Sequence, residues 1–387
     1  MTSQNSYLAS KPRYEILDGL RGVAAIIVLL YHQFDLYATG NPADSIINHG
    51  YLAVDFFFIL SGYVIGYAYD DRWGRMTLGL FFKRRLIRLH PMIVFGVLLG
   101  MVCFYFGAGP MFPLIADCPV WKLLLCSLVA ILMIPMPVSM DIRGWNEINA
   151  VNGNMWSLFF EYIANVLYAL FIRHLPRRVL ALLVAAFALL TVNLALNIDV
   201  LGVLTGRTAN AYTMIGGWTW NAEQMFIGFT RLLYPFFAGL LMSRLRWGIR
   251  LRGGFWVSGL ALAAVLVMPR VGGGNALLNG VYEAVCVLAV FPLIVAVGAG
   301  SHVTGRSLGV CKFLGDISYP LYLVNYPLVY TLLGGWRAAH PDAPLDQVLF
   351  INAMVFMLNI FMAWAALKVF DEPVRAWLRK KCFKPRN

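Results

Sequence analysis

Five ionisable residues stand inside long apolar stretches of the 387-residue sequence: His32, Asp55, Glu161, Arg231 and Glu283. A charge in a lipid-like surrounding is costly, so each of them marks either a functional site or a structural ion pair between helices. His32 is the only one of the six histidines that falls well inside such a stretch. Because imidazole titrates near neutrality, His32 is a candidate general base.

Two groups of cations add a second chemistry. Arg21 and His32 are eleven residues apart, which on a helix is about 16 Å of rise and about 20° of rotation, so they share one face. Arg85 and Arg88, at i and i+3 in KRRLIR, can present two guanidiniums to a phosphate. An ordinary basic loop would explain the positive charge of this segment but not the number of its cations. The spacing suits a long donor with a phosphorylated head near the arginines and a reactive tail near His32.

Counting residues along the apolar stretches predicts how deep each group lies. Glu161 is about 9 Å from one end of its stretch, His32 lies at a similar depth, and Asp55 is a little shallower. We therefore expect an acid/base cluster of His32 with these carboxylates. Ser157 shares a helix face with Glu161, whereas Trp156 points elsewhere and is either part of the site or an interfacial anchor.

The composition predicts the elements that position these groups. The chain is 60% hydrophobic and only 13% charged, about half the charge of a soluble domain, which excludes a soluble enzyme, a disordered tail and a disulfide scaffold. We predict an all-α integral membrane protein with about ten transmembrane helices. The apolar stretches are about 19–38, 51–70, 90–107, 155–172, 179–197, 223–243, 255–269, 279–300, 313–333 and 347–369.

The distribution of the net charge of +12 predicts the topology. With ten spans and both termini cytoplasmic, most of the 31 Lys and Arg residues fall on the cytoplasmic side, as the positive-inside rule requires. An eleventh span at 121–137 would reverse every later loop, so we predict a re-entrant or interfacial segment there. The expected organisation is a cytoplasmic segment 1–18, one transmembrane domain 19–370 and a basic cytoplasmic tail 371–387.

Other function classes receive little support from the sequence. No basic run carries the interleaved aromatic residues of a nucleic-acid groove, so we expect no nucleic-acid partner. The six cysteines lack metal-ligand spacing, so no metal site is expected. The amino-terminal segment lacks the apolar core of a signal peptide, which predicts an uncleaved first span.

Six sequence blocks, in order over about residues 14–375, resemble the motifs of the membrane acyltransferase-3 family, bacterial O-acyltransferases that modify surface carbohydrates. One block has Arg and His separated by ten residues, another has the RxxR element, and the others resemble VDxFFxxSG, WSLxxE, ISYxxYLxHxP and the usual end of the last span. They are LDGLRGVAAIIVLLYHQF (17–34), VDFFFILSGYVI (54–65), FFKRRLIRLHP (81–91), NMWSLFFEYIANVLY (154–168), LGDISYPLYLVNYPL (314–328) and FDEPVR (370–375).

The resemblance implies an enzyme of the bacterial inner membrane that transfers an acyl group, most commonly acetyl, from cytoplasmic acyl-CoA to a hydroxyl of a carbohydrate or glycolipid. Acyl-CoA is then a co-substrate, no bound cofactor is implied, and a polysaccharide-synthesis complex is a candidate partner. Arg21, His32, Arg85, Arg88, Trp156 and Glu161 fall on the family's functional positions, and Asp55, Ser61, Gly62 and Tyr322 on its motif positions.

One position departs from the family's pattern. Asn325 stands where YLxHxP often has His. An amide does not exchange a proton at neutral pH, so Asn325 is expected to form hydrogen bonds or to reflect a different acceptor.

The leading hypothesis is direct transfer. Arg21, Arg85 and Arg88 hold the CoA phosphates, His32 takes the proton of the acceptor hydroxyl, and Asp55 or Glu161 orients His32. A ping-pong variant places the acyl group on His32 or Ser61, although a Ser-Gly pair in a span more often serves helix packing. Trp145, Trp218 and Trp220, in the predicted outer loops 108–154 and 198–222, either stack on sugar rings or belong to the interfacial aromatic belt.

Two other function classes stay open at this point. A proton-coupled transporter or exporter of a carbohydrate or anionic solute would use His32 and Glu161 as a proton relay. A passive partner in a polysaccharide-synthesis complex would need none of these ionisable groups.

Overall fold

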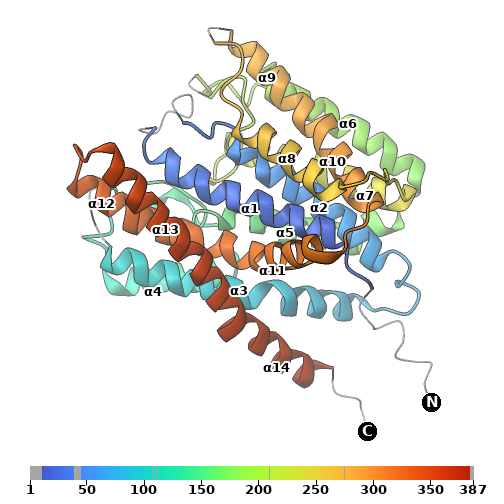
Figure 1. The fold of residues 1–387 in the computed structure, drawn as a ribbon, viewed down its shortest axis with the longest axis horizontal. Helices are drawn as coiled ribbons and strands as arrows, with labels where there is room; N and C mark the ends of the chain where they lie inside the picture. The colour runs from blue at the N-terminus through green and yellow to red at the C-terminus, as the bar shows by residue number, and fades with distance from the viewer. Residues whose placement is uncertain are drawn as a thin grey trace.

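The computed structural model describes residues 11–38, 45–107, 109, 111–208, 210–273 and 275–383. These residues form helices and connecting loops, with no strand among them. Each of the ten predicted apolar stretches is one helix or one continuous helical rod, and Figure 1 shows α1, α3, α11 and α13 among the long rods. Residues 1–10 of the predicted amino-terminal segment and 384–387 of the predicted tail lie outside the described residues.

The helices are bounded as follows. Three of the rods contain a π-helical turn, and a short helix, α4, lies outside the ten rods. The elements are α1 (Glu15–Asp35), α2 (Ala53–Tyr69), α3 (Leu78–Phe106), α4 (Val120–Ile131), α5 (Met155–Leu170), α6 (Arg177–Ala195), α7 (Ala222–Leu245), α8 (Gly254–Val267), α9, η6 and α10 (Ala276–Val285, Cys286–Val290, Phe291–Gly300), α11, η7 and α12 (Gly305–Leu328, Val329–Leu333, Gly334–Ala339), and α13, η8 and α14 (Leu345–Ala365, Ala366–Asp371, Glu372–Cys382).

Six helical segments of the described chain are long and apolar enough to cross a membrane. Helices α4, α5 and α8 are apolar but shorter than 18 residues. The all-helical class is therefore confirmed, whereas the number of spans and the side on which each terminus lies stay predictions. The six segments are Gly50–Tyr69, Leu78–Phe106, Arg177–Ala195, Ala222–Leu245, Ala276–Gly300 and Leu345–Cys382.

The predicted non-spanning segment 121–137 contains α4, which has 12 residues. Such a helix is about 18 Å long, well short of the roughly 30 Å hydrocarbon core of a bilayer. The chain then turns through Pro137 and a 3₁₀ turn at Val138–Met140. This length fits a segment that does not cross the membrane.

Small residues let two pairs of helices approach to backbone contact. A Cβ at Gly62 of α2 would lie 2.0 Å from the carbonyl oxygen of Phe236 in α7, and a Cβ at Gly239 would lie equally close to that of Ile59. In the same way, a Cβ at Gly22 of α1 would meet α11 at 2.4 Å. Gly62, a predicted site residue, therefore acts on the fold through helix packing.

The backbone hydrogen-bond pattern of α11 is broken at Pro327, where the site forms. Pro327 has no N–H, so the carbonyl of Leu323 lacks its intrahelical partner. The side-chain Nδ2 of Asn152 donates to that carbonyl at 2.8 Å, which docks the loop before α5 onto α11. The π-helical turn η7 follows directly, and such turns are frequent at functional sites.

Candidate active site

His32 lies near the carboxyl end of α1 with both ring nitrogens engaged. Nδ1 is 3.0 Å from the hydroxyl of Tyr330, and Nε2 is 2.8 Å from Oδ1 of Asn154. The Tyr330 hydroxyl also donates to the carboxylate of Asp35 at 3.1 Å. Polar groups from α1, η7 and the residue before α5 therefore meet at one imidazole.

Asn325 supports this arrangement from α11. Nδ2 of Asn154 donates to Oδ1 of Asn325 at 2.9 Å and to the backbone carbonyl of Tyr322 at 2.8 Å. The geometry of Asn325 therefore fits the hydrogen-bonding role that was predicted for it.

A cavity of about 260 Å³ opens beside His32. Aromatic side chains form much of its wall, together with a few polar groups, as is usual for a pocket that binds a small polar ligand. Trp145 and Trp218 of the predicted outer loops line it, and Trp156 does as well. The other lining residues are Val28, Tyr31, Asp35, Gly50, Tyr51, Val54, Gly144, Glu147, Gly153, Asn154, Arg231, Tyr322, Tyr326 and Tyr330.

Asp55 is paired with Arg231 rather than with His32. The carboxylate accepts from the Arg231 guanidinium at 2.7 Å, and both side chains are fully buried. Arg231 also donates to the backbone carbonyls of Tyr51 at 2.6 Å and Gly216 at 2.9 Å. These contacts tie α2, α7 and the loop before α7 together, so the geometry favours a structural ion pair at Asp55.

Glu161 also lies away from His32. It accepts from Arg85 at 2.9 Å and from the hydroxyl of Ser61 at 3.3 Å. Glu161 is seven residues after Asn154, which is about 10 Å along the axis of α5. The expectation that Glu161 and His32 share one depth is therefore wrong, because the His32 contact is made at the start of α5 and not two turns into it.

The three predicted phosphate-binding arginines gather around the amino-terminal halves of α1 and α3. Arg88 is exposed and lies close enough to Arg21 and Arg85 for their charges to repel. Arg21 pairs with Asp18, and Arg85 is buried against Glu161. The cluster predicted from the sequence exists, and Arg88 is its most exposed member.

The remaining predicted residues divide between the cavity and its support. The hydroxyls of Ser157 and Tyr322 are 2.7 Å apart and hold α5 against α11. Trp156 is buried at the cavity wall, with the Arg231 guanidinium 5.0 Å from its ring centre. Ser61 faces Glu161 and is not among the residues that line the cavity.

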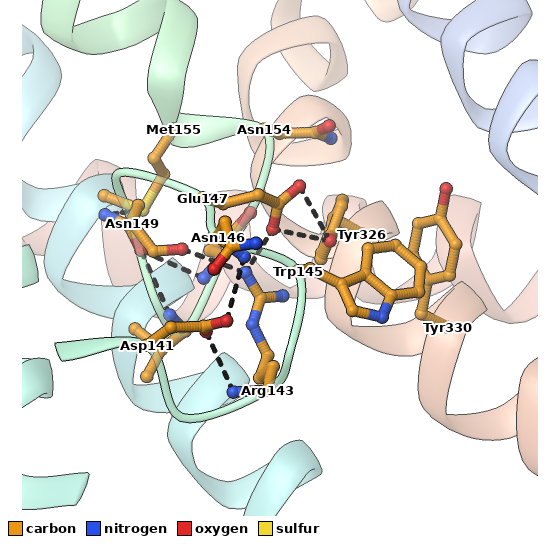
Figure 2. A network of polar contacts seen from close by, with 12 residues as sticks. Asp141, Arg143, Trp145, Asn146, Glu147, Asn149, Asn154, Met155, Tyr326 and Tyr330 are labelled. Carbon is orange, nitrogen blue, oxygen red and sulfur yellow. Dashed lines mark hydrogen bonds and ion pairs between the residues drawn. The ribbon is translucent and has the colours of Figure 1, made fainter. Parts of the chain in front are cut away.

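The loop between α4 and α5 supplies a carboxylate that the sequence reasoning missed (Figure 2). Glu147 lines the cavity, pairs with the fully buried Arg143, and accepts from the hydroxyl of Tyr326 at 2.8 Å. Burial raises the pKa of Glu147, while Arg143 and the Tyr326 hydroxyl act in the opposite direction. Asp141 fixes the loop by accepting from the backbone N–H groups of Arg143, Gly144 and Asn146.

Three sequence signals could have found the missed residues. Tyr322, Tyr326 and Tyr330 recur every four residues, which places them on one face of the helical rod. The stretch NEINAVNGN at 146–154 is rich in amides, which predicts a loop held by side-chain hydrogen bonds. Asp35 follows His32 by three residues and shares its helix face.

A comparison with known families decides the classification. The sequence model for the acyltransferase domain of the acyltransferase-3 family matches residues 14–367. The chain belongs to the acyltransferase-3 family. The expected resemblance is confirmed, and with its long apolar helices the chain is a multi-pass membrane protein of this family.

Several curated proteins are similar to this acyltransferase-3 chain. The O-acetyltransferase OatA of Staphylococcus aureus is 25% identical over 96% of the chain, which spans 58% of that protein. The acyltransferase MdmB of Streptomyces mycarofaciens is 27% identical over 84% of the chain and 81% of its own length. Protein 2 in the picA locus of Rhizobium radiobacter is 34% identical over 41% of the chain and 81% of its own length. No solved structure matches the chain.

Membership of this family supports O-acyltransferase activity. Neither the family nor the named relatives supports the transporter alternative.

Proposed function

We propose that the protein transfers an acyl group, most simply acetyl, from cytoplasmic acyl-CoA to a hydroxyl of a surface or exported carbohydrate or glycolipid. The observation that carries the proposal is the cavity in which His32 lies among aromatic and polar side chains. Aromatic faces suit the apolar faces of sugar rings, while Glu147 offers carboxylate oxygens to sugar hydroxyls.

The other end of α1 provides the donor side. Arg88 forms a cationic group with Arg21 and Arg85, which are each paired with a carboxylate, and Arg21 is about 16 Å of helix rise from His32. The phosphates of coenzyme A would bind these guanidiniums, and the thioester at the end of its long arm would reach toward His32.

We propose ten spans in the bacterial inner membrane with both termini cytoplasmic. Contacts at the arginine end of the fold support this topology. Arg244 pairs with Asp70 at 2.8 Å, Lys11 pairs with Asp71 at 2.7 Å, and Arg173 lies over Trp73. Cations of predicted cytoplasmic segments thus meet on one side, as the positive-inside rule expects.

The chemical step takes place between the two substrates, with His32 as the base. The acceptor O–H bond breaks as its proton moves to His32, and the oxygen attacks the thioester carbonyl. The C–S bond then breaks, and the departing thiolate takes the proton to leave as the free thiol. The acceptor becomes an O-acyl ester.

The test uses the purified full chain in detergent with acetyl-CoA and a surface polysaccharide stripped of its O-acyl groups by mild alkali. We expect free thiol to appear with matching O-acetyl esters on the polysaccharide, measured by mass spectrometry. Thermal stabilisation by acetyl-CoA provides a separate measure of donor binding. The proposal fails if acetyl-CoA neither stabilises the protein nor loses its acyl group to any stripped surface glycan of the expressing cells.

A further inference from the structure

The hydrogen bonds around Asn325 fix the orientation of its amide. Its Nδ2 donates to the backbone carbonyls of Leu321 at 2.9 Å and Tyr322 at 3.3 Å. A carbonyl oxygen can only accept, so the NH₂ group must face α11 and Oδ1 must face Asn154.

Asn154 is fixed by the same logic. Its Nδ2 donates to the carbonyl of Tyr322 and to Oδ1 of Asn325, at 2.8 and 2.9 Å. Both partners are acceptors, so Oδ1 of Asn154 is the atom that faces Nε2 of His32, at 2.8 Å. An amide oxygen accepts only, and Nε2 must therefore carry a proton.

A neutral imidazole carries one proton, so Nδ1 of His32 is left with its lone pair. The group that faces Nδ1 is the Tyr330 hydroxyl, 3.0 Å away, which is also 3.1 Å from Asp35. The single phenolic proton can point at only one of these two acceptors at a time. The one lone pair of Nδ1 is directed at the Tyr330 oxygen, and Tyr330 lines the cavity, so a ligand hydroxyl reaches Nδ1 through the Tyr330 hydroxyl.

We propose that Nδ1 of His32 removes the acceptor proton by way of the Tyr330 hydroxyl, and that Asn154 and Asn325 act as positioning residues that hold the Nε2–H tautomer of His32. The Tyr330 hydroxyl, turned toward Asp35, then accepts a hydrogen bond from the newly protonated Nδ1. Asp35 stabilises the imidazolium through Tyr330. The sequence had predicted Asp55 or Glu161 as the carboxylate in this role. This inference rests on the proposed acyl transfer.

The atoms balance in this step. The acceptor O–H bond breaks as its proton moves to the Tyr330 oxygen, and the phenolic proton of Tyr330 moves to Nδ1. The acceptor oxygen bonds to the acyl carbon, and the C–S bond of the thioester breaks. The proton returns through Tyr330 to the thiolate, and the neutral Nε2–H tautomer is restored. This network also gives a reason for the asparagine at position 325, where the family pattern often has His. The amide of Asn325 offers two donor hydrogens and an acceptor at once, whereas a neutral imidazole offers one donor and one acceptor.

Other charged and titratable groups also surround His32. Asp35 shares α1 with it, Tyr326 and Tyr330 face it from the α11 rod, and Glu147 and Arg231 line the same cavity. The test therefore changes only the amides and leaves these groups in place.

The experiment compares Asn325→Leu and Asn154→Asp with Asn359→Leu in the full chain. Asn359 is a matched control, because it is fully buried and donates to the carbonyl four residues before it, as Asn325 does. Initial rates are measured from pH 5 to pH 9 with acetyl-CoA and the alkali-stripped polysaccharide, and melting temperatures verify folding.

We expect Asn325→Leu to lower kcat by about tenfold or more without raising the KM for acetyl-CoA, because Asn154 can then turn and release the tautomer. A carboxylate beside Nε2 favours the imidazolium, so Asn154→Asp should move the acidic limb of the rate profile upward by about one pH unit or more. Asn359→Leu should keep kcat within about twofold of the wild-type value.

The inference is overturned if both folded variants keep the wild-type kcat and pH profile while the wild-type protein is active. A wild-type protein that transfers no acyl group refutes the proposed function instead, so the two failures are distinguishable.

Discussion

Two clusters in this protein use the same kinds of residue and differ in what they face. His32 contacts Asn154 and Tyr330, with Asp35 behind them, and lies against a cavity. His49 contacts Asn279 at 3.1 Å and the carbonyl of Met268 at 2.7 Å.

The His49 cluster is closed. Glu283 accepts from Asn279 at 2.7 Å and from the hydroxyl of Tyr51 at 2.5 Å, and His49 and Glu283 are fully buried. Neither of these two side chains is among the residues that line the cavity. Both clusters contain buried ionisable groups, so burial alone does not distinguish a catalytic cluster from a structural one. The His32 cluster is suited to chemistry because His32 itself lines the cavity.

The largest expected effect is on the open cluster. His32→Gln should lower the rate of acyl transfer by about 10²–10⁴-fold, the usual contribution of a general base. Its melting temperature should stay close to that of the wild type, because a glutamine can keep the contact with Asn154. The rate of thiol release from acetyl-CoA in the presence of stripped polysaccharide measures this. A folded variant with the wild-type rate would remove His32 from the mechanism.

The next effect concerns the buried pair of Asp55 and Arg231. Asp55→Asn leaves a buried guanidinium without its counter-charge, which should cost about 3–5 kcal/mol of stability. The double variant Asp55→Leu with Arg231→Met should recover much of the lost melting temperature, since two apolar side chains can replace a buried ion pair. A stable Asp55→Asn protein that has lost only its activity would instead make Asp55 catalytic.

His49→Gln is the counterpart of the first variant. Removing a partner from the closed cluster should lower stability by about 1–3 kcal/mol, because buried groups lose hydrogen bonds. The rate per folded molecule should stay within about threefold of the wild type. Thermal unfolding measures the stability, and the rate divided by the concentration of folded protein measures the activity. A large loss of rate without a loss of stability would erase the contrast between the clusters.

At the arginine end, Arg88 is exposed, whereas Arg85 is already paired with Glu161. Arg88→Gln should raise the KM for acetyl-CoA by about tenfold, since a charge-assisted hydrogen bond contributes about 1.5–3 kcal/mol, and should leave kcat unchanged. Arg306→Gln removes another exposed cation and is the control, with no change expected in KM. Equal effects of the two variants would mean that only the net charge matters.

The smallest effect is expected at Ser61. Its hydroxyl donates to Glu161 at 3.3 Å, away from the cavity, so Ser61→Ala should change the rate by less than about threefold. The wild-type protein is incubated with radiolabelled acetyl-CoA in the absence of acceptor, and the reaction is then stopped with acid. We expect no label on Ser61. A labelled peptide containing Ser61 would establish the covalent route.

The sequence predicted the helices far better than the partners of the ionisable groups. Apolar stretches are local, so all ten became helices, and the face shared by Arg21 and His32 follows from helix geometry alone. The ring partners of His32 are 122 and 298 residues away in sequence, and Asp55 and Arg231 are 176 residues apart. No periodicity reveals such pairings.

The depth estimate for Glu161 failed for a related reason. The depth of each residue was counted from the end of its own apolar stretch. In the structure the loop before α5 packs against α11, and this contact places Asn154, rather than Glu161, beside His32. The polar docking of that loop depends on Pro327 and several amides together, so the local sequence alone did not reveal it.

Chemical modification by diethyl pyrocarbonate tests the contrast most directly, because the reagent acylates an accessible neutral imidazole. The purified full chain is treated for increasing times, and the modified fraction of each histidine is measured by peptide mass spectrometry alongside the remaining activity. We predict that activity falls in step with modification of His32, that stripped polysaccharide slows both, and that His49 stays unmodified in the folded protein. Loss of activity with His32 unmodified, or modification of His49 before His32, would contradict the account.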